Sequence, residues 1–178
     1  KQKGLWLCFL FFVFSLLSKP AAIVLPLVLF LLDYWKQRPF NRKLILEKIP
    51  FFLIAGLFTV ITLKLQSVTA ITSLDVYPIW VRLFFACYVV MIYMFRFFVP
   101  YPLSSFHPFP PPGDLGWPVY LAPLFLIGLL FFIWRFRKNK VIVFGFFFFL
   151  INILLVLQLI SIGFTIVSER YTYVPYIG

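Results

Sequence analysis

The chain has 178 residues, of which 63% are hydrophobic and 22% aromatic, whereas soluble domains are roughly 45–50% apolar. Sixteen basic and five acidic residues give it a formal net charge of +11. This composition excludes a soluble globular domain and predicts an all-α membrane protein that crosses the bilayer several times.

The first hydrophobic block, residues 4–35, is interrupted by Ser18, Lys19 and Pro20. One continuous helix would place Lys19 in the middle of the membrane, at a cost of about 3 kcal/mol or more. Pro20 also disfavours helical geometry at the residue before it. We therefore predict two short helices that meet in a turn at the non-cytoplasmic surface.

A third helix is predicted from about Ile49 to Gln66, after a basic linker at residues 36–48. The linker follows Tyr34 and Trp35, which are typical of the aromatic belt at a membrane surface. It contains five basic residues, and a second basic segment, RFRKNK at Arg135–Lys140, carries four more. The positive-inside rule places both segments on the cytoplasmic side, so the positive charge indicates a membrane surface and argues against a nucleic-acid partner.

The next segment, residues 79–99, contains a charge-free stretch of only thirteen residues, Leu83–Phe95, against the roughly 20 residues of a spanning helix. A single crossing here would also place RFRKNK outside. We therefore predict a re-entrant or interfacial helix, with Arg82 and Arg96 directed toward the polar side. A full span with a reversed charge bias is the alternative.

Seven prolines from Pro100 to Pro118 exclude a regular helix, so residues 100–116 are predicted to form an extended proline-rich loop on the outer surface. Two further spanning helices are predicted, from Trp117 to Trp134 and from Val141 to about Val167. The whole chain, residues 1–178, is then a single transmembrane domain. Its predicted fold is a multi-spanning helical bundle of about five spanning helices, one re-entrant or interfacial helix and the outer loop.

The acidic residues offer no closely spaced pair and the chain has a single histidine, so no metal site and no bound cofactor are predicted. Asp33 beside Lys36 and Glu47 beside Lys48 are expected to form interfacial ion pairs. Only Glu169 lies in a segment with other candidate functional residues.

Basic residues are few on the predicted outer side, and two of them stand out: Lys19 in LSKPA and Arg170 in SERYTYVP. A guanidinium can bind a phosphate through two parallel hydrogen bonds, and an ammonium adds a point charge. The alternative is structural, because basic side chains snorkel at helix ends and tyrosines populate the membrane interface. His107, in SSFHPFP, is either a loop residue packed among aromatic rings or part of a site.

Four stretches, in this order, resemble the bacterial relatives of the transmembrane and tetratricopeptide-repeat O-mannosyltransferases: LLSKPAAIVLPLVLFLLDYW, EKIPFFLIAGLFTVITL, PLSSFHPFPPPG and ERYTYVPYIG. That family belongs to the GT-C glycosyltransferases, which take a sugar from a polyprenyl phosphate on the periplasmic or lumenal face of a membrane. The resemblance implies that Lys19, Arg170 and Tyr171 bind the phosphate of the donor. Further candidates to line the site are Glu169, Tyr173 and His107.

The chain departs from this family in three respects. Family members carry an acidic motif in the first outer loop, which would lie upstream of Lys1, and they carry tetratricopeptide repeats, which are absent here. Many relatives have Tyr at the position of His107, which argues against a general catalytic role for this residue. We therefore expect an inactive fragment of a longer protein, with an unknown catalytic residue and no support for a divalent metal.

The resemblance implies transfer of a sugar, with mannose as a candidate, to a protein hydroxyl. The expected partners are the lipid bilayer, a lipid-linked sugar and a protein acceptor, and the expected location is the bacterial cytoplasmic membrane. Two alternatives stay open. A transporter or flippase of lipid-linked intermediates would use the helix that is broken at Lys19 and Pro20, and a non-catalytic scaffold would leave binding to other domains.

Overall fold

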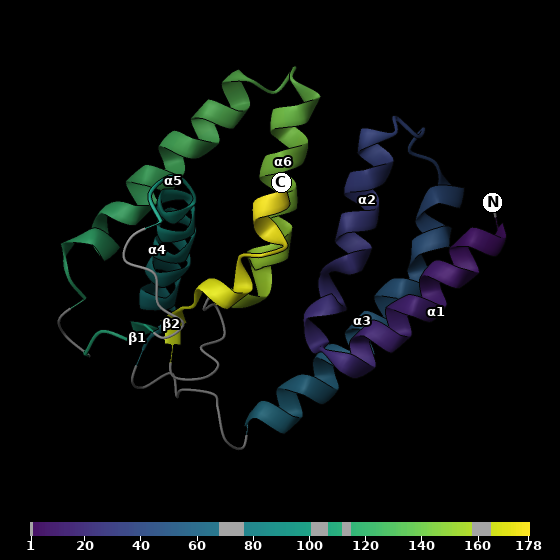
Figure 1. Ribbon diagram of the computed structural model, residues 1–178, viewed down its shortest axis with the longest axis horizontal. Coiled ribbons are helices and arrows are strands. Elements are labelled where there is room, and N and C mark those ends of the chain that lie inside the picture. Colours follow the sequence, from purple (N-terminus) through teal and green to yellow (C-terminus); the bar gives the residue numbers. More distant parts are fainter. Residues whose placement is uncertain (1, 68–76, 101–106, 112–114, 158–164) are drawn as a thin grey trace. The chain divides into compact units, whose positions relative to one another are not determined.

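A computed structural model of the chain describes residues 2–67, 77–100, 107–111, 115–157 and 165–178 (Figure 1). Its described part contains six α-helices and two very short strands, so the prediction of an all-α protein is confirmed. The chain divides into two compact units, Lys1–Val68 and Thr69–Gly178, and each is described by itself.

The first unit contains three α-helices and one 3₁₀ turn. They are α1 (Gln2–Ser18), η1 (Pro20–Val24), α2 (Leu25–Trp35) and α3 (Arg42–Ser67). Lys19, between α1 and η1, has extended φ and ψ angles of −149° and 122°, as expected for a residue before proline. The predicted break of the first hydrophobic block is therefore confirmed. The core of the unit is formed by Phe12 and Leu16 of α1 and by Phe51 and Ala55 of α3.

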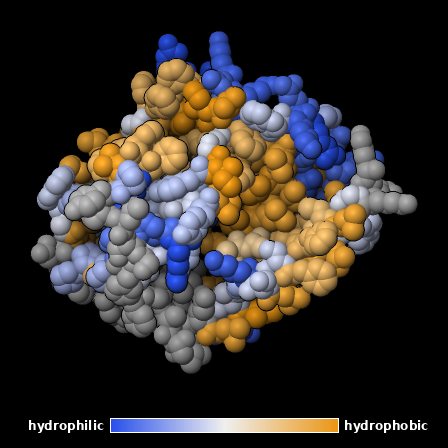
Figure 2. Space-filling view, viewed as in Figure 1, coloured by the Kyte–Doolittle hydropathy of each residue, from blue (hydrophilic) through white to orange (hydrophobic). Residues whose placement is uncertain are grey.

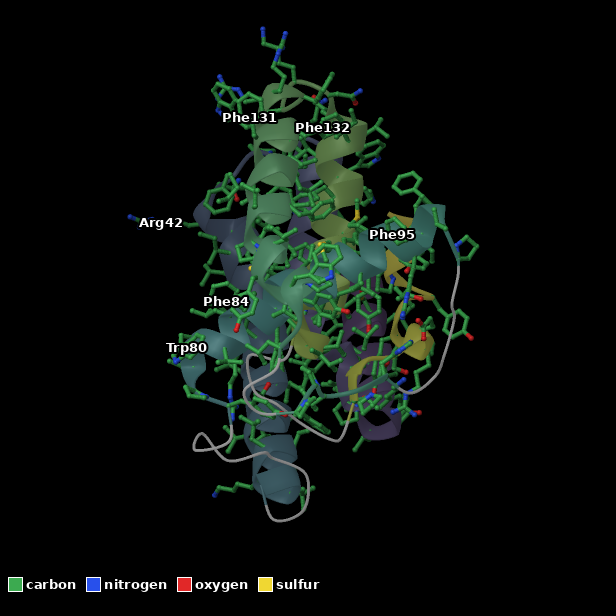
Figure 3. The ribbon with its side chains drawn as sticks, turned by 90° about the vertical axis from the view of Figure 1, so that its left-hand side faces the viewer. Arg42, Trp80, Phe84, Phe95, Phe131 and Phe132 are labelled. Atoms are coloured by element: carbon green, nitrogen blue, oxygen red, sulfur yellow. The ribbon has the colours of Figure 1, made fainter. Side chains whose placement is uncertain are left out.

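Only residues 36–41 of the basic linker predicted at residues 36–48 lie outside a helix. α3 begins at Arg42, seven residues before the predicted start at Ile49. Asn41 explains the earlier start, because its side-chain oxygen accepts a hydrogen bond from the amide of Leu44 at 2.9 Å, as an N-terminal cap does. Arg42 projects outward at the start of the helix (Figure 3).

Ion pairs join the end of α2 to the start of α3, but with different partners from those predicted. Asp33 contacts Arg38 and Lys48, each at 2.9 Å, and Arg38 also contacts Glu47 at 2.9 Å. Lys48 is only 3% exposed. The predicted pairs of Asp33 with Lys36 and of Glu47 with Lys48 were wrong because the packing of α2 on α3 selects partners that are not sequence neighbours.

The second unit contains the remaining elements. They are α4 (Ile79–Phe98), β1 (His107–Pro108), α5 (Trp117–Arg135), α6 (Lys140–Ile153), η2 (Leu154–Val156), β2 (Thr165–Val167), η3 (Glu169–Tyr171) and η4 (Pro175–Ile177). The core is built around Phe85, Val89 and Tyr93 of α4 and Ile153 of α6, none of which is exposed. α5 begins at Trp117, as predicted, after Gly116, whose φ of 69° suits a residue without a side chain.

The helix predicted from Val141 to about Val167 is shorter than expected. α6 and η2 end at Val156, and Thr165–Val167 forms β2, which pairs antiparallel with β1 and places His107 opposite Val167. Three consecutive β-branched residues, Thr, Ile and Val, favour this extended conformation. The strand pair joins the proline-rich segment to the C-terminal segment.

Three helices are long and apolar enough to cross a membrane, namely Arg42–Leu65 of α3, Ile79–Phe98 of α4 and Trp117–Arg135 of α5. Only 11% of the apolar 18-residue stretch of α5 is buried within the protein. Hydrophobic side chains cover much of the visible surface of the described residues (Figure 2). The helical segments on either side of Lys19, and α6 with η2, are shorter. The protein is thus an integral membrane protein with about three candidate spans.

α4 differs from the predicted helix at residues 79–99 in two ways. It is one unbroken helix of 20 residues, so it is not re-entrant, and its length would allow the alternative of a full span. It nevertheless runs at a slant across α5 and α6 (Figure 3). On α4, the rings of Trp80 and Phe84 meet edge to face, with 6.4 Å between the ring centres. An interfacial placement of α4 stays a prediction.

Arg82 and Arg96 do not point toward a polar surface as predicted. Arg82 is 3% exposed, and its Nε donates a hydrogen bond to the carbonyl oxygen of Tyr77 at 2.8 Å. The Arg96 side chain is 10% exposed and pairs with Glu169. Both arginines therefore bind groups of the protein itself, which compensate them for the loss of water.

Candidate functional site

The segment Ser168–Tyr171 is attached to α4 through Tyr93. The phenol of Tyr93 donates a hydrogen bond to the carbonyl oxygen of Ser168 at 3.0 Å and accepts one from the amide of Ser168 at 3.1 Å. Tyr176, five residues after the end of this segment, donates a hydrogen bond from its hydroxyl to the carbonyl oxygen of Tyr93 at 2.9 Å. Since Tyr93 and Ser168 are buried, these contacts fix the start of the segment against the helix.

Glu169 is held between two basic side chains. Its Oε1 forms an ion pair with Nη1 of Arg96, one turn after Tyr93 on α4, and lies 3.4 Å from Nε2 of His107 on β1. The backbone carbonyl of Glu169 accepts a hydrogen bond from the hydroxyl of Thr172 at 2.7 Å. The structure therefore brings together two predicted site residues, His107 and Glu169, and adds Arg96, which the sequence analysis placed at the surface.

Arg170 is exposed beside this buried cluster. Its Nη2 donates a hydrogen bond to the hydroxyl of Tyr171 at 2.8 Å, and its guanidinium carbon lies 4.9 Å from the centre of the same ring. No described residue forms an ion pair with Arg170. The neighbouring carboxylate of Glu169 is directed to Arg96 instead, so Arg170 presents an oriented positive charge that an anion could bind.

Two predicted site residues lie away from this arrangement. Tyr173 is 79% exposed, and its side chain makes no hydrogen bond with another residue that the structure describes. Lys19 is exposed at the junction of α1 and η1 and belongs to the first unit. Its pairing with Arg170, which belongs to the second unit, therefore stays a prediction.

A cavity of about 370 Å³ lies beside the Arg96, Glu169 and His107 cluster. Arg96, His107 and Tyr88 line it together with apolar residues of the proline-rich segment, of α4 and of β2. A second cavity of about 230 Å³ is lined almost entirely by apolar side chains of α4, α5 and α6 and by the turn around Tyr176. The first cavity is the one that combines polar groups with apolar walls, as ligand sites do.

The sequence analysis missed Tyr93 and Arg96 as parts of the site. The sequence did contain an indication for Arg96, because an arginine in a hydrophobic segment needs an acidic partner. Glu169 was the acidic residue to consider, since the sequence analysis had assigned it no ion-pair partner. Tyr93 offered no such signal, since a tyrosine among apolar residues is ordinary.

No group of three or more His, Cys, Asp or Glu side chains within the described ranges could hold a metal ion. No protein-family model, curated protein or solved structure matches the chain.

Proposed function

We propose that the chain is part of a membrane glycosyltransferase that transfers a sugar from a polyprenyl-phosphate donor to a protein hydroxyl. The observation that carries the proposal is the state of Arg170, which is exposed, oriented by Tyr171 and without an ion pair to any described residue. The resemblance of the sequence to the GT-C O-mannosyltransferase relatives supplies the reaction class, with mannose as a candidate sugar.

The proposed role of Arg170 is to bind the phosphate of the donor. During transfer, the bond between the sugar carbon and the phosphate oxygen breaks, a bond from that carbon to the acceptor oxygen forms, and polyprenyl phosphate leaves. A guanidinium beside the leaving phosphate stabilises the charge that develops on its oxygen. Lys19 is proposed to add a second positive charge, and the base that takes the proton of the acceptor hydroxyl is not assigned to a residue of this chain.

The proposed location is the bacterial cytoplasmic membrane, with Lys36–Lys48 and Arg135–Lys140 on the cytoplasmic side. α4 is proposed to lie near the outer surface rather than to cross the membrane alone. The slant of α4 across α5 and α6 supports this placement (Figure 3).

The test is sugar transfer by the full-length protein in isolated membranes. Arg137→Ala is the matched control for Arg170→Ala, because Arg137 is also exposed and also lies against an aromatic ring, that of Trp134, at 5.6 Å. We expect Arg170→Ala to lower the transfer rate by about 100-fold, the effect of losing a charge-assisted contact to the leaving group, and Arg137→Ala to leave it within about twofold.

Three results separate the alternatives. Equal transfer by the wild type and Arg170→Ala would contradict the proposed role of Arg170. Movement of the lipid-linked sugar across the membrane without any transfer would indicate a transporter. Absence of both activities, with donor binding also absent, would indicate a scaffold.

A further inference from the structure

The turn between α5 and α6 concentrates positive charge. Its segment RFRKNK, Arg135–Lys140, contains four basic side chains and no acidic one, and all four are exposed. None of the four forms an ion pair with a described residue of the second unit. The carboxylate side chain described in this unit, that of Glu169, is paired with Arg96. The turn therefore presents a positive charge that no described residue of this unit neutralises.

The backbone of this turn is ordered by hydrogen bonds. The amide of Asn139 donates to the carbonyl oxygen of Phe136 at 2.8 Å. The side-chain oxygen of Asn139 accepts a hydrogen bond from the amide of Val141 at 3.0 Å, which caps the start of α6. The turn thus holds Arg135 at the end of α5 and Lys140 at the start of α6 in a fixed arrangement.

The apolar cavity of about 230 Å³ begins next to this turn. Arg135 comes two residues after Ile133, Lys140 comes two residues before Ile142, and both isoleucines line the cavity. Each interval is a helical rise of about 3 Å. α6 lines the cavity as far as Phe149, seven residues after Ile142, which is about 10 Å along the helix. The cavity therefore leads from the basic turn into the region where α5 and α6 separate (Figure 1).

The walls of this cavity suit a hydrocarbon chain. They are almost entirely apolar and include Met94 and Phe98 of α4, Phe132 of α5 and Phe146 of α6. Water gains no hydrogen bonds in such a space, and an empty space loses the dispersion contacts of its lining. In an integral membrane protein, the acyl chains of the surrounding lipid are the apolar material that can fill it.

Aromatic residues beside the turn indicate the depth of the lipid headgroups. Trp134 is exposed, and the guanidinium carbon of Arg137 lies 5.6 Å from the centre of its ring. Tryptophan is typical of this depth in a membrane. Phe131 and Phe132 lie just below the turn, with nitrogen atoms of basic side chains beyond them (Figure 3). Trp134 does not line the cavity, so Arg137 is held apart from it.

We propose that the α5–α6 turn and this cavity together bind one anionic phospholipid, with its phosphate at Arg135 and Lys140 and one acyl chain in the cavity. A phospholipid has its parts in the same order, since glycerol joins the phosphate to the acyl chains. Arginine binds a phosphate through two parallel hydrogen bonds, and lysine adds a point charge. A zwitterionic headgroup brings a cation of its own, which the turn repels, so the site selects a lipid with a net negative charge.

This inference goes beyond the proposed function, because Arg135 and Lys140 have no part in the proposed sugar transfer. The apolar cavity distinguishes a lipid from a soluble phosphate, since a soluble phosphate has no group that would fill it.

The test is a titration of the full-length protein in detergent micelles with palmitoyl-oleoyl phosphatidylglycerol and palmitoyl-oleoyl phosphatidylcholine, which share the same acyl chains. Native mass spectrometry counts the bound lipids. We expect one phosphatidylglycerol to bind about tenfold more tightly than phosphatidylcholine, because two basic side chains attract its headgroup. The double variant Arg135→Ala with Lys140→Ala should lose this preference. Ile142→Trp fills the cavity and should weaken the binding of both lipids about tenfold, the effect of withdrawing about two methylene groups from it.

Each variant has a matched control. Arg42→Ala with Lys43→Ala removes two exposed positive charges from the start of α3, in the other basic segment. Val141→Trp adds the same indole at an exposed position of α6 that does not line the cavity. Both controls should bind the two lipids as the wild type does.

Four results would overturn the proposal or part of it. Equal affinity of the wild type for the two lipids would contradict the role of the turn, as would an equal loss of phosphatidylglycerol binding in the two double variants. Unchanged binding by folded Ile142→Trp would contradict the assignment of the cavity. Competition by glycerol 3-phosphate at the concentration of the lipid would show that a soluble phosphate is sufficient. If Ile142→Trp does not fold, the comparison of the two double variants decides.

Discussion

Tyr93 and Ser168, 75 residues apart, exchange two hydrogen bonds, since one phenol hydroxyl both donates to the carbonyl oxygen and accepts from the amide of Ser168. This contact makes the position of the candidate site depend on α4. The ion pair of Arg96 with Glu169 and the hydrogen bond from the hydroxyl of Tyr176 to the carbonyl oxygen of Tyr93 reinforce the same attachment.

Replacement of Tyr93 by Phe should lower the free energy of unfolding by about 1–3 kcal/mol, because the buried amide of Ser168 loses its acceptor and the carbonyl oxygen of Ser168 keeps only the amide of Tyr171 as a donor. Thermal unfolding in detergent, followed by circular dichroism, measures the change. Tyr120→Phe, at a half-exposed position of α5, is the control and should have little effect. Equal stability of the two variants would contradict the anchoring role of Tyr93.

The ion pair of Arg96 with Glu169 should show strong coupling. Arg96→Met removes the guanidinium from the largely buried carboxylate of Glu169, and Glu169→Gln removes the negative charge beside the largely buried Arg96, so each should cost about 1–3 kcal/mol of unfolding free energy. The double variant removes both charges and should cost less than the sum of the single ones, by a coupling energy of about 0.5–3 kcal/mol. Additive losses in a double-mutant cycle would show that the pair is not formed.

Gly145 and Gly128 form a matched pair of helical glycines. A Cβ atom at Gly145 of α6 would collide with the backbone carbonyl of Gly178, the residue that follows η4, whereas a Cβ atom at Gly128 of α5 meets nothing within 4 Å. Gly145→Ala should therefore displace the C-terminal turn and destabilise the protein by about 1–3 kcal/mol. Gly128→Ala should be neutral or stabilising by up to about 1 kcal/mol. Unfolding midpoints measured side by side check the difference, and the reverse order would refute the packing of η4 on α6.

In the first unit, Asp33→Asn should be strongly destabilising, because it leaves the buried ammonium of Lys48 without a carboxylate. A loss of about 3 kcal/mol is expected from a broken buried pair. The double variant Asp33→Asn with Lys48→Met should recover part of the stability, since no charge is then left buried. Chemical unfolding in mixed micelles distinguishes the two variants, and a double variant that is no better than the single one would argue against the pair.

The elements that could be predicted from the sequence are those determined by near neighbours. Pro20 acts on Lys19 directly, and the break between α1 and η1 lies where it was expected. The start of α5 at Trp117 also depends on adjacent residues, namely Gly116 at the N-terminal cap and Pro118 in the first turn. The early start of α3 could have been found as well, because Asn41 is a favoured N-terminal cap.

The parts that were not predicted depend on residues far apart in the chain. β2 replaces the end of the expected last helix because it pairs with His107, about 60 positions away, and periodicity cannot reveal such a partner. Arg96 was placed at a surface because its partner, Glu169, lies 73 residues later. The candidate site is therefore only partly visible in the sequence: Arg170 and Tyr171 are in the motif, whereas Tyr93 and Arg96 hold that motif in place.

The most direct test of the central proposal is the binding of polyprenyl phosphate to the protein in lipid nanodiscs, with polyprenol as the probe that lacks the phosphate. The account predicts that the wild type binds polyprenyl phosphate more tightly than polyprenol, that Arg170→Ala weakens this binding about tenfold or more, and that Arg137→Ala does not. Equal affinities of the wild type and Arg170→Ala for polyprenyl phosphate would contradict it.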